Sequence, residues 1–161
     1  MAEASRRASR RGPANALFVV AAAERIPPEL AGIADELMIL FPWGSLLRGV
    51  LALDDAAAAA DGFASLLAPG GTATAFLSIE DSDGLAGLPS LDAPNACEEL
   101  RERWSQHGLV VCDLRPATAQ EIAATGSTWA KRLGAGRERA AWRLELREAG
   151  KSPPDGLGTR R

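Results

Sequence analysis

The sequence has few of the side chains that hold metals or support histidine-based catalysis. It contains no tyrosine, a single histidine (His107) and two cysteines, Cys97 and Cys112, which stand 15 positions apart without C-x-x-C spacing. Zinc sites and Ser-His-type triads need clusters of such residues, so the sequence predicts no metal site and no histidine-based triad. We expect the two thiols to be reduced, ordinary core or surface residues.

The chain also lacks a long apolar run. The two longest, residues 14–23 (interrupted by Asn15) and 37–41, fall far short of the roughly 20 residues that cross a bilayer. The arginine-rich start has no apolar stretch of the secretory type, so we expect a cytoplasmic protein with no membrane partner; a transit peptide is the alternative for this start. With 161 residues, 47% of them apolar, the chain is long enough for one domain with its own core.

Charges of opposite sign occupy different parts of the second half. Nine acidic residues and three arginines lie between positions 80 and 121, although the net charge of the whole chain is only −3. Between positions 127 and 143 the balance reverses, with one acid against Lys131, Arg132, Arg137, Arg139 and Arg143. A local group of cations in an acidic chain favours a phosphate-facing patch, and a solvated helix face is the alternative that charge alone leaves open.

Apolar periodicity and turn residues predict alternating strands and helices. The expected strands are 16–22 and 36–41, both buried, followed by 72–79, 109–114 and 140–148. The expected helical segments are 2–11, 27–30, 44–51, 54–68, 95–107, 117–124 and 127–133, with a turn at 69–71 and a loop at 81–94. This order is typical of a layered α/β fold with a mostly parallel sheet, in which ligands bind at the carboxyl ends of the strands.

Two of the four tryptophans stand in polar, turn-like motifs. Trp43 belongs to Leu-Phe-Pro-Trp-Gly-Ser at 40–45, and Trp129 belongs to Ser-Thr-Trp-Ala-Lys-Arg-Leu at 127–133. An indole beside proline, glycine, serine and basic residues can stack on a ligand or a base. The alternative for each is an indole packed in the core.

Three segments together resemble one protein family. They are Phe-Val-Val-Ala-Ala-Ala-Glu-Arg-Ile-Pro at 18–27, Ile-Leu-Phe-Pro-Trp-Gly-Ser-Leu-Leu-Arg-Gly-Val at 39–50 and the motif at 127–133. They look like the aminoglycoside-resistance methyltransferases that modify N1 of a decoding-site adenine in 16S rRNA, over about residues 2–148. The resemblance implies a class I, Rossmann-like methyltransferase that uses S-adenosylmethionine (SAM), acts on the small ribosomal subunit and is a monomer.

The resemblance also implies roles for individual residues. Trp43 and Trp129 would sandwich the flipped adenine. The cofactor pocket would be lined by Ala23, Glu24, Leu40, Pro42, Ser45 and Ser127, with Ala23 and Glu24 against the cofactor adenine. The rRNA phosphates would be held by Lys131, Arg132, Arg137 and Arg139. This chemistry needs no histidine, because the N1 lone pair of adenine lies in the ring plane and requires in-line placement more than a general base.

The sequence departs from the family pattern in its cofactor-binding motifs. Class I methyltransferases bind SAM on a glycine-rich turn after the first strand and on an acidic residue that ends the second, and neither is found here. Gly134-Ala135-Gly136 lacks a third glycine and follows a helical turn, not a strand. The family pattern begins in this chain at the helix that follows the second strand. We therefore expect an N-terminally truncated chain whose sheet lacks its first two strands, with Met1 either an internal methionine or the start of a gene that lost its front.

A sheet without those two strands has two expected outcomes. Either the segment 16–22 pairs directly with 36–41, or an apolar edge of Met38, Ile39 and Leu40 is exposed. We expect a partial methyltransferase domain over 1–148 and a disordered tail over 149–161. Three functions remain open: SAM-dependent N1 methylation of the decoding-site adenine by an impaired chain, a catalytically inactive rRNA-binding remnant, and a non-functional fragment.

Overall fold

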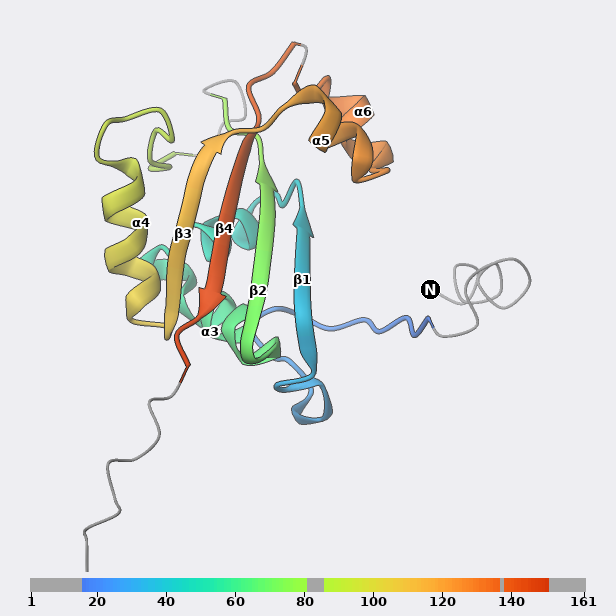
Figure 1. Cartoon of the computed structure of the whole chain (residues 1–161), viewed down its shortest axis with the longest axis vertical. Coiled ribbons are helices and arrows are strands. Elements are labelled where there is room, and N and C mark those ends of the chain that lie inside the picture. The colour runs from blue at the N-terminus through green and yellow to red at the C-terminus, as the bar shows by residue number, and fades with distance from the viewer. Residues whose placement is uncertain (1–15, 81–85, 137, 151–161) are drawn as a thin grey trace, which may run out of the picture.

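A four-stranded mixed sheet forms the centre of the molecule (Figure 1). The computed structural model describes residues 16–80, 86–136 and 138–150. The strands are β1 (Ala34–Leu40), β2 (Leu67–Leu77), β3 (Leu109–Pro116) and β4 (Trp142–Glu148), in the order β1-β2-β4-β3. β1 and β2 pair in parallel, and β4 is antiparallel to both of its neighbours. β1, β2 and β3 therefore run in one direction, as expected of a mostly parallel sheet, and β4 runs in the other. Because β4 lies between β2 and β3, only the pair β1–β2 of the described sheet is parallel.

Helices flank the sheet and extend over one of its ends. They are η1 (Pro28–Leu30), α2 (Ser45–Val50), η2 (Asp54–Ala56), α3 (Ala57–Leu66), α4 (Ala96–Ser105), α5 (Ala119–Ala124) and α6 (Thr128–Leu133). α3 lies behind the sheet, α4 runs along β3, and α5 and α6 lie together at the end where β1 and β2 finish (Figure 1). These helices agree with the predicted ones to within a few residues, whereas the predicted helix at 2–11 and the tail from 151 lie outside the described residues.

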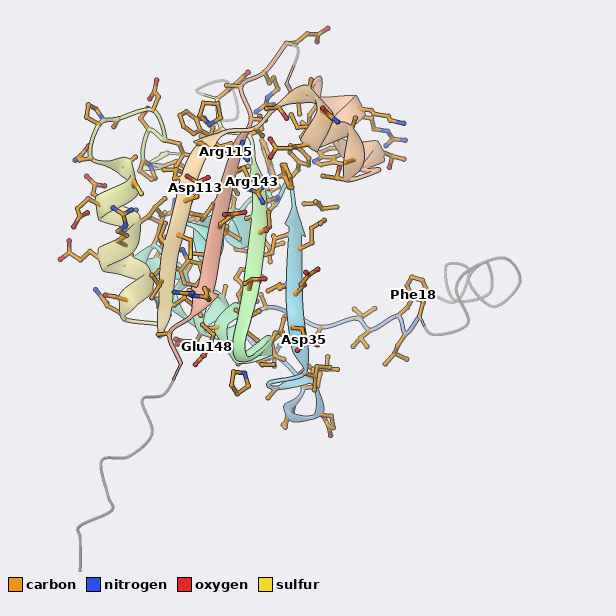
Figure 2. The ribbon with its side chains drawn as sticks, viewed as in Figure 1. Phe18, Asp35, Asp113, Arg115, Arg143 and Glu148 are labelled. Atoms are coloured by element: carbon orange, nitrogen blue, oxygen red, sulfur yellow. The ribbon has the colours of Figure 1, made fainter. Side chains whose placement is uncertain are left out.

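The predicted buried strand at 16–22 is wrong. Residues 16–21 form no regular element, and the segment projects from the body of the molecule, with Phe18 pointing away from it (Figure 2). Leu17 and Val20 are 81% and 72% exposed. An apolar run forms a strand only where a neighbouring strand supplies hydrogen-bond partners, and none lies beside this segment in the described sheet. The chain first enters the core at Ala23, whose carbonyl lies against Gly62 of α3.

The predicted burial of the next strand is also wrong, because β1 is an edge strand of the described sheet. Ile39 is buried, but Met38 is 59% exposed and Leu40 is 36% exposed. Of the two outcomes predicted for an incomplete sheet, the structure therefore has the apolar edge, with Ile39 packed inward.

The predicted turn at 69–71 is part of β2. The strand starts at Leu67 and continues through Pro69, Gly70 and Gly71, with a register shift against β1. Glycine makes this continuous path possible. A Cβ atom on Gly71 would lie 2.8 Å from the Ala34 carbonyl oxygen, so β1 and β2 could not approach each other as closely with a larger residue. Gly70 has a φ of +77°, and its N–H donates to the Glu148 carboxylate at 2.9 Å.

Two apolar clusters stabilise the fold. The larger one packs α2, α3 and α4 against the sheet and includes the fully buried Trp104, whose indole N–H donates to the Val50 carbonyl at 3.2 Å. The smaller one, called the α5–α6 cluster below, consists of Phe41, Phe76, Ile122, Ala130, Ala135 and Ala141. It lies where β1 and β2 end, and so determines how the last two helices sit on the sheet.

Candidate functional site

The turn after β1 holds Phe41 inside the protein and leaves Trp43 outside. Phe41 is 4% exposed, its N–H donates to the Phe76 carbonyl at 2.8 Å, and it has a φ of +48°, which is uncommon for a residue with a side chain. Gly44 has φ +58° and ψ −130°, a conformation that glycine reaches far more readily than other residues. Between them, Trp43 is 45% exposed. The Phe-Pro-Trp-Gly motif therefore encodes a strained turn that presents an indole at the carboxyl end of β1.

The second motif forms a capped helix that presents the other indole. The Ser127 side chain accepts a hydrogen bond from the Ala130 N–H at 3.1 Å and so caps α6, which ends at Gly134 in the left-handed conformation. Ala130 is buried in the α5–α6 cluster, whereas its neighbour Trp129 is 45% exposed. The local sequence thus fixes which side of α6 faces the core.

The α5–α6 cluster brings the two tryptophan-bearing segments to one end of the sheet. Phe41, two residues before Trp43, and Ala130, next to Trp129, both belong to it. The sequence left open that each indole packs in the core. The structure excludes this alternative, because both side chains are about half exposed. Whether the rings close on one base stays a prediction.

The expected cofactor residues fall into two groups. Leu40, Pro42 and Ser45 form one continuous stretch at the carboxyl end of β1 and the start of α2, with Pro42 buried and Ser45 exposed. Ala23 is 8% exposed and Glu24 is exposed, in a turn that the Arg25 N–H closes by donating to Ala22 at 3.0 Å.

Ser127 lies instead on the α6 side of the site. It lines a cavity of about 320 Å³ between α5 and α6, together with Ala119, Ile122, Ala123, Ala130, Lys131, Gly134 and Ala135. Its hydroxyl is already used as the cap of α6. Its assignment to the cofactor pocket stays a prediction.

The expected phosphate-binding residues have different surroundings. Lys131 and Arg132 are exposed on the last turn of α6. Arg139 has only 15% of its side chain exposed and lies 3.4 Å from the carboxylate of Glu80. Arg137 lies outside the described residues. Lys131 and Arg132 are therefore the members of the set that the structure places in the open.

The sequence did not reveal a charged network at the end of β3 and the start of β4. Arg115 donates to both oxygens of Glu121, at 3.0 and 2.5 Å, and the N–H of Thr118 donates to the same carboxylate at 2.9 Å. Figure 2 shows Asp113, Arg115 and Arg143 gathered at this end of the two strands. The Thr118-x-x-Glu121 spacing is that of a capping box and could have indicated the start of α5. The partnership with Arg115 depends on the fold.

The network shifts the ionisation of both main partners. Hydrogen bonds from Arg115 above all, and then from Thr118, hold the pKa of the Glu121 carboxyl far below its ordinary value. The hydrogen bond from Arg115 to Glu121, followed by the attraction of the nearby carboxylates, raises the pKa of the Arg115 guanidinium above its already high value. Both groups are therefore charged at neutral pH.

Trp142 was also not recognised as a possible site residue. It is partly buried and forms one wall of a cavity of about 580 Å³, which is bounded further by Ile79, Glu80, residues 86–92 and Ala140. In the sequence it stands within an expected strand, where a core indole and a cavity-lining indole look alike.

Within residues 16–80, 86–136 and 138–150, no three His, Cys, Asp or Glu side chains lie close enough together to hold a metal ion. In the same part of the chain, no helix has the length and apolar character needed to span a membrane.

Comparison with known proteins identifies the class of fold as that of methyltransferases. The structure superposes on that of the antibiotic-resistance methyltransferase Kmr with a TM-score of 0.73 and 30% sequence identity, covering 94% of this chain and 72% of that one. It also superposes on a mutant 16S rRNA (adenine(1408)-N(1))-methyltransferase from Catenulisporales acidiphilia, solved with its cosubstrate SAM (TM-score 0.68, 28% identity, 85% of this chain and 62% of that one).

The sequence comparisons name the family. Residues 1–147 match the model of NpmA, 16S rRNA (adenine(1408)-N(1))-methyltransferase. A 16S rRNA (adenine(1408)-N(1))-methyltransferase from Escherichia coli is 35% identical over 140 residues, which are 84% of this chain and 64% of that protein. The chain belongs to the 16S rRNA (adenine(1408)-N(1))-methyltransferase family. Three curated relatives match this chain over 140 to 142 residues, and the chain spans 64% of the length of each of them.

Proposed function

We propose that this chain carries the target-base and rRNA-binding part of a SAM-dependent methyltransferase that modifies N1 of the decoding-site adenine in 16S rRNA and so confers aminoglycoside resistance. The observation that supports this most is the pair of indoles, Trp43 and Trp129. Each is 45% exposed, and each is mounted beside a buried residue of the same α5–α6 cluster. Family membership gives the reaction class, and these two side chains provide a place for the base.

The two indoles account for capture of the base without an acid–base residue. Extruding a base from its stack costs a few kcal/mol, and stacking on one aromatic ring returns about 1 to 3 kcal/mol. Two rings can therefore offset most of that cost. The N1 lone pair lies in the plane of the adenine, so rings that hold both faces leave N1 open at its edge.

The residues at the end of β1 fit the adenosine half of SAM. Buried Pro42 and partly exposed Leu40 offer an apolar wall, and Ser45 adds an exposed hydroxyl at the start of α2. We assign Ala23 and Glu24 to the same half, with the Glu24 carboxylate available for a hydrogen bond. When bound, SAM supplies the electrophilic methyl group, and the protein residues bind it and orient the target base.

The exposed cations support contact with the small ribosomal subunit. Lys131 and Arg132 stand on the helix that carries Trp129, so a phosphate held by them would lie next to the captured nucleotide. Arg137 and Arg139 complete the proposed set, and Arg139 would have to exchange its contact with Glu80 for a phosphate.

An rRNA-binding remnant without catalysis is the second candidate. It is favoured by the exposed edge of β1, which adjoins the proposed cofactor residues Leu40 and Pro42, whereas Trp129 and the two exposed cations lie on α6, which the α5–α6 cluster holds. RNA binding could therefore persist where cofactor binding does not.

A chimera separates these candidates. The part of the Escherichia coli relative that lies outside its match with this chain is joined to this chain, and the chimera is incubated with small subunits and SAM. A methyl group on N1 blocks Watson–Crick pairing, so reverse transcription stops at the modified adenine. We expect a stop that disappears in the W43A and W129A variants. A chimera that binds subunits and SAM but leaves the adenine unmodified favours the remnant, and absence of subunit binding by both chimera and chain overturns the proposal.

A further inference from the structure

The helices that carry part of the proposed site depend on the sheet for their position. α5 and α6 have six residues each, whereas isolated helices of fewer than about 12 residues are marginal in water. Three residues, 125–127, connect them. A displacement of α5 is therefore passed directly to α6 and to Trp129.

On its polar side, α5 is tied to the sheet through Glu121. Arg115, at the end of β3, holds both carboxylate oxygens, and Asp113 lies 3.1 Å from the same guanidinium. Arg143 on β4 approaches the Glu121 carboxylate at 3.7 Å. The planar guanidinium matches a carboxylate through two parallel hydrogen bonds, which fixes direction as well as distance.

On its apolar side, α5 is tied to the neighbours of both indoles through the next residue, Ile122. Ile122 is 7% exposed and belongs to the α5–α6 cluster with Phe41 and Ala130. The chain that follows α6 packs closely on it, since a Cβ atom on Gly136 would lie 2.5 Å from Ile122 Cδ1. Consecutive residues of one short helix thus connect the sheet with both tryptophan-bearing segments.

We propose that the Arg115–Glu121 pair positions Trp129 for base capture. The pair orients α5 on the sheet, and Ile122 and Ala130 pass that orientation to the indole. Arg115 and Glu121 are positioning residues in this scheme and touch neither base nor cofactor. The inference rests on the proposed function, because the position of Trp129 affects recognition only if its ring stacks on the base.

The first test needs no RNA. Acrylamide quenching is measured for the chain and for its W129F variant, and the difference isolates the fluorescence of Trp129. In R115Q the two parallel charged hydrogen bonds are lost, so we expect Trp129 to become more accessible to the quencher. R101Q is the matched control, because it makes the same substitution at an exposed arginine that pairs with Glu98 on α4 and leaves α5 untouched; we expect wild-type quenching. R115K keeps the positive charge but cannot make the two parallel hydrogen bonds of a guanidinium, so its quenching should lie between that of R115Q and that of wild type.

The second test measures base recognition. Binding is compared for small subunits with adenine or guanine at the target position. We expect R115Q to lose several-fold of the preference for adenine while the salt dependence of binding is unchanged, and R101Q to keep the preference. Unchanged quenching in R115Q, or equal effects in R115Q and R101Q, would overturn the inference. If the wild-type chain does not bind subunits, the proposed function fails, and the quenching result still decides whether the pair positions Trp129.

Discussion

The rings of Phe41 and Phe76 lie with their centroids 6.2 Å apart at an interplanar angle of 32°, at the point where β1 and β2 end. The backbone adds to this contact, because the Phe41 N–H donates to the Phe76 carbonyl. Since Phe41 has a positive φ, the chain must leave the sheet in a tight turn immediately after this contact. The pair therefore links the packing of the sheet to the display of Trp43.

From this contact we predict that substitutions of Phe41 and Trp43 differ greatly in their effect on the free energy of unfolding. F41A removes a buried ring and should destabilise the fold by about 3 to 5 kcal/mol, whereas F41L should cost about 1.5 kcal/mol or less. W43F, at a half-exposed position, should stay within about 0.5 kcal/mol of wild type. Urea denaturation measures all three. A W43F variant as unstable as F41A would show that Trp43 is a core residue and not a displayed one.

The base clamp predicts a loss of binding without a loss of stability. W43A and W129A should each weaken binding to small subunits by about 1 to 3 kcal/mol, because each removes one stacking surface, while leaving the unfolding midpoint close to that of wild type. The double variant should lose less than the sum of the two, since both rings hold the same base. Titration of fluorescently labelled subunits at constant salt measures this. Fully additive losses would indicate that the two indoles act on separate parts of the RNA.

The cations predict a change in salt dependence. K131A and R132A should each lower the slope of log affinity against log salt by roughly one, because each removes one phosphate contact and its released counterion. R101A is the control: Arg101 is an exposed cation on α4, where it pairs with Glu98. Its removal should leave the slope unchanged. Equal slopes in K131A, R132A and R101A would remove α6 from the RNA interface.

The Glu121 carboxyl predicts loss of stability in acid. Its folded-state pKa is lowered from an ordinary value of 4.5, so the unfolded chain takes up the proton first as the pH falls. The stabilisation is fully present above pH 4.5 and is lost as the pH falls toward the folded-state pKa. The groups that face this carboxyl are the guanidinium groups of Arg115 and Arg143 and the N–H and hydroxyl of Thr118.

The matched variant is E121Q, which keeps the shape of the side chain and cannot ionise. Its unfolding free energy should fall less than that of wild type between pH 6 and pH 3, so the two curves should converge in acid. Parallel curves over this interval would contradict the assignment. Thermal unfolding followed by circular dichroism at each pH gives the comparison.

Elements determined by local sequence were predicted well, and those that depend on distant partners were not. The helix expected at 95–107 is α4, followed by Gly108 with a φ of +74°, because periodicity and a glycine stop are both readable within a few residues. The segment 16–22 has an equally clear apolar pattern and still forms no strand, because a strand needs a neighbour. The glycines at 70 and 71 look like a turn but allow two strands to approach closely.

The same distinction holds for the candidate site. The motifs around Trp43 and Trp129 could be recognised because each presents its indole through local turn and cap chemistry. The Arg115–Glu121 pair joins the end of β3 to α5, and the contact of Arg139 with Glu80 joins residues far apart in the chain. Such contacts between charged side chains are determined by the fold and have no local pattern.

The last prediction concerns SAM. The sequence has no recognisable glycine-rich SAM-binding motif, and β1 is an edge of the described sheet. Hydrogen bonds to charged groups contribute roughly 1.5 to 3 kcal/mol each, so a pocket without those to the ribose and the methionine end should bind SAM about a thousandfold more weakly than a complete one. We expect titration calorimetry to detect little binding by the 161-residue chain and no methyl transfer to small subunits. The chimera should bind SAM, and should bind it more weakly in the P42A and S45A variants, because Pro42 and Ser45 then line a closed pocket. Micromolar binding by the 161-residue chain itself would show that its own residues close the pocket, and the exposed edge of β1 would no longer explain any loss of activity.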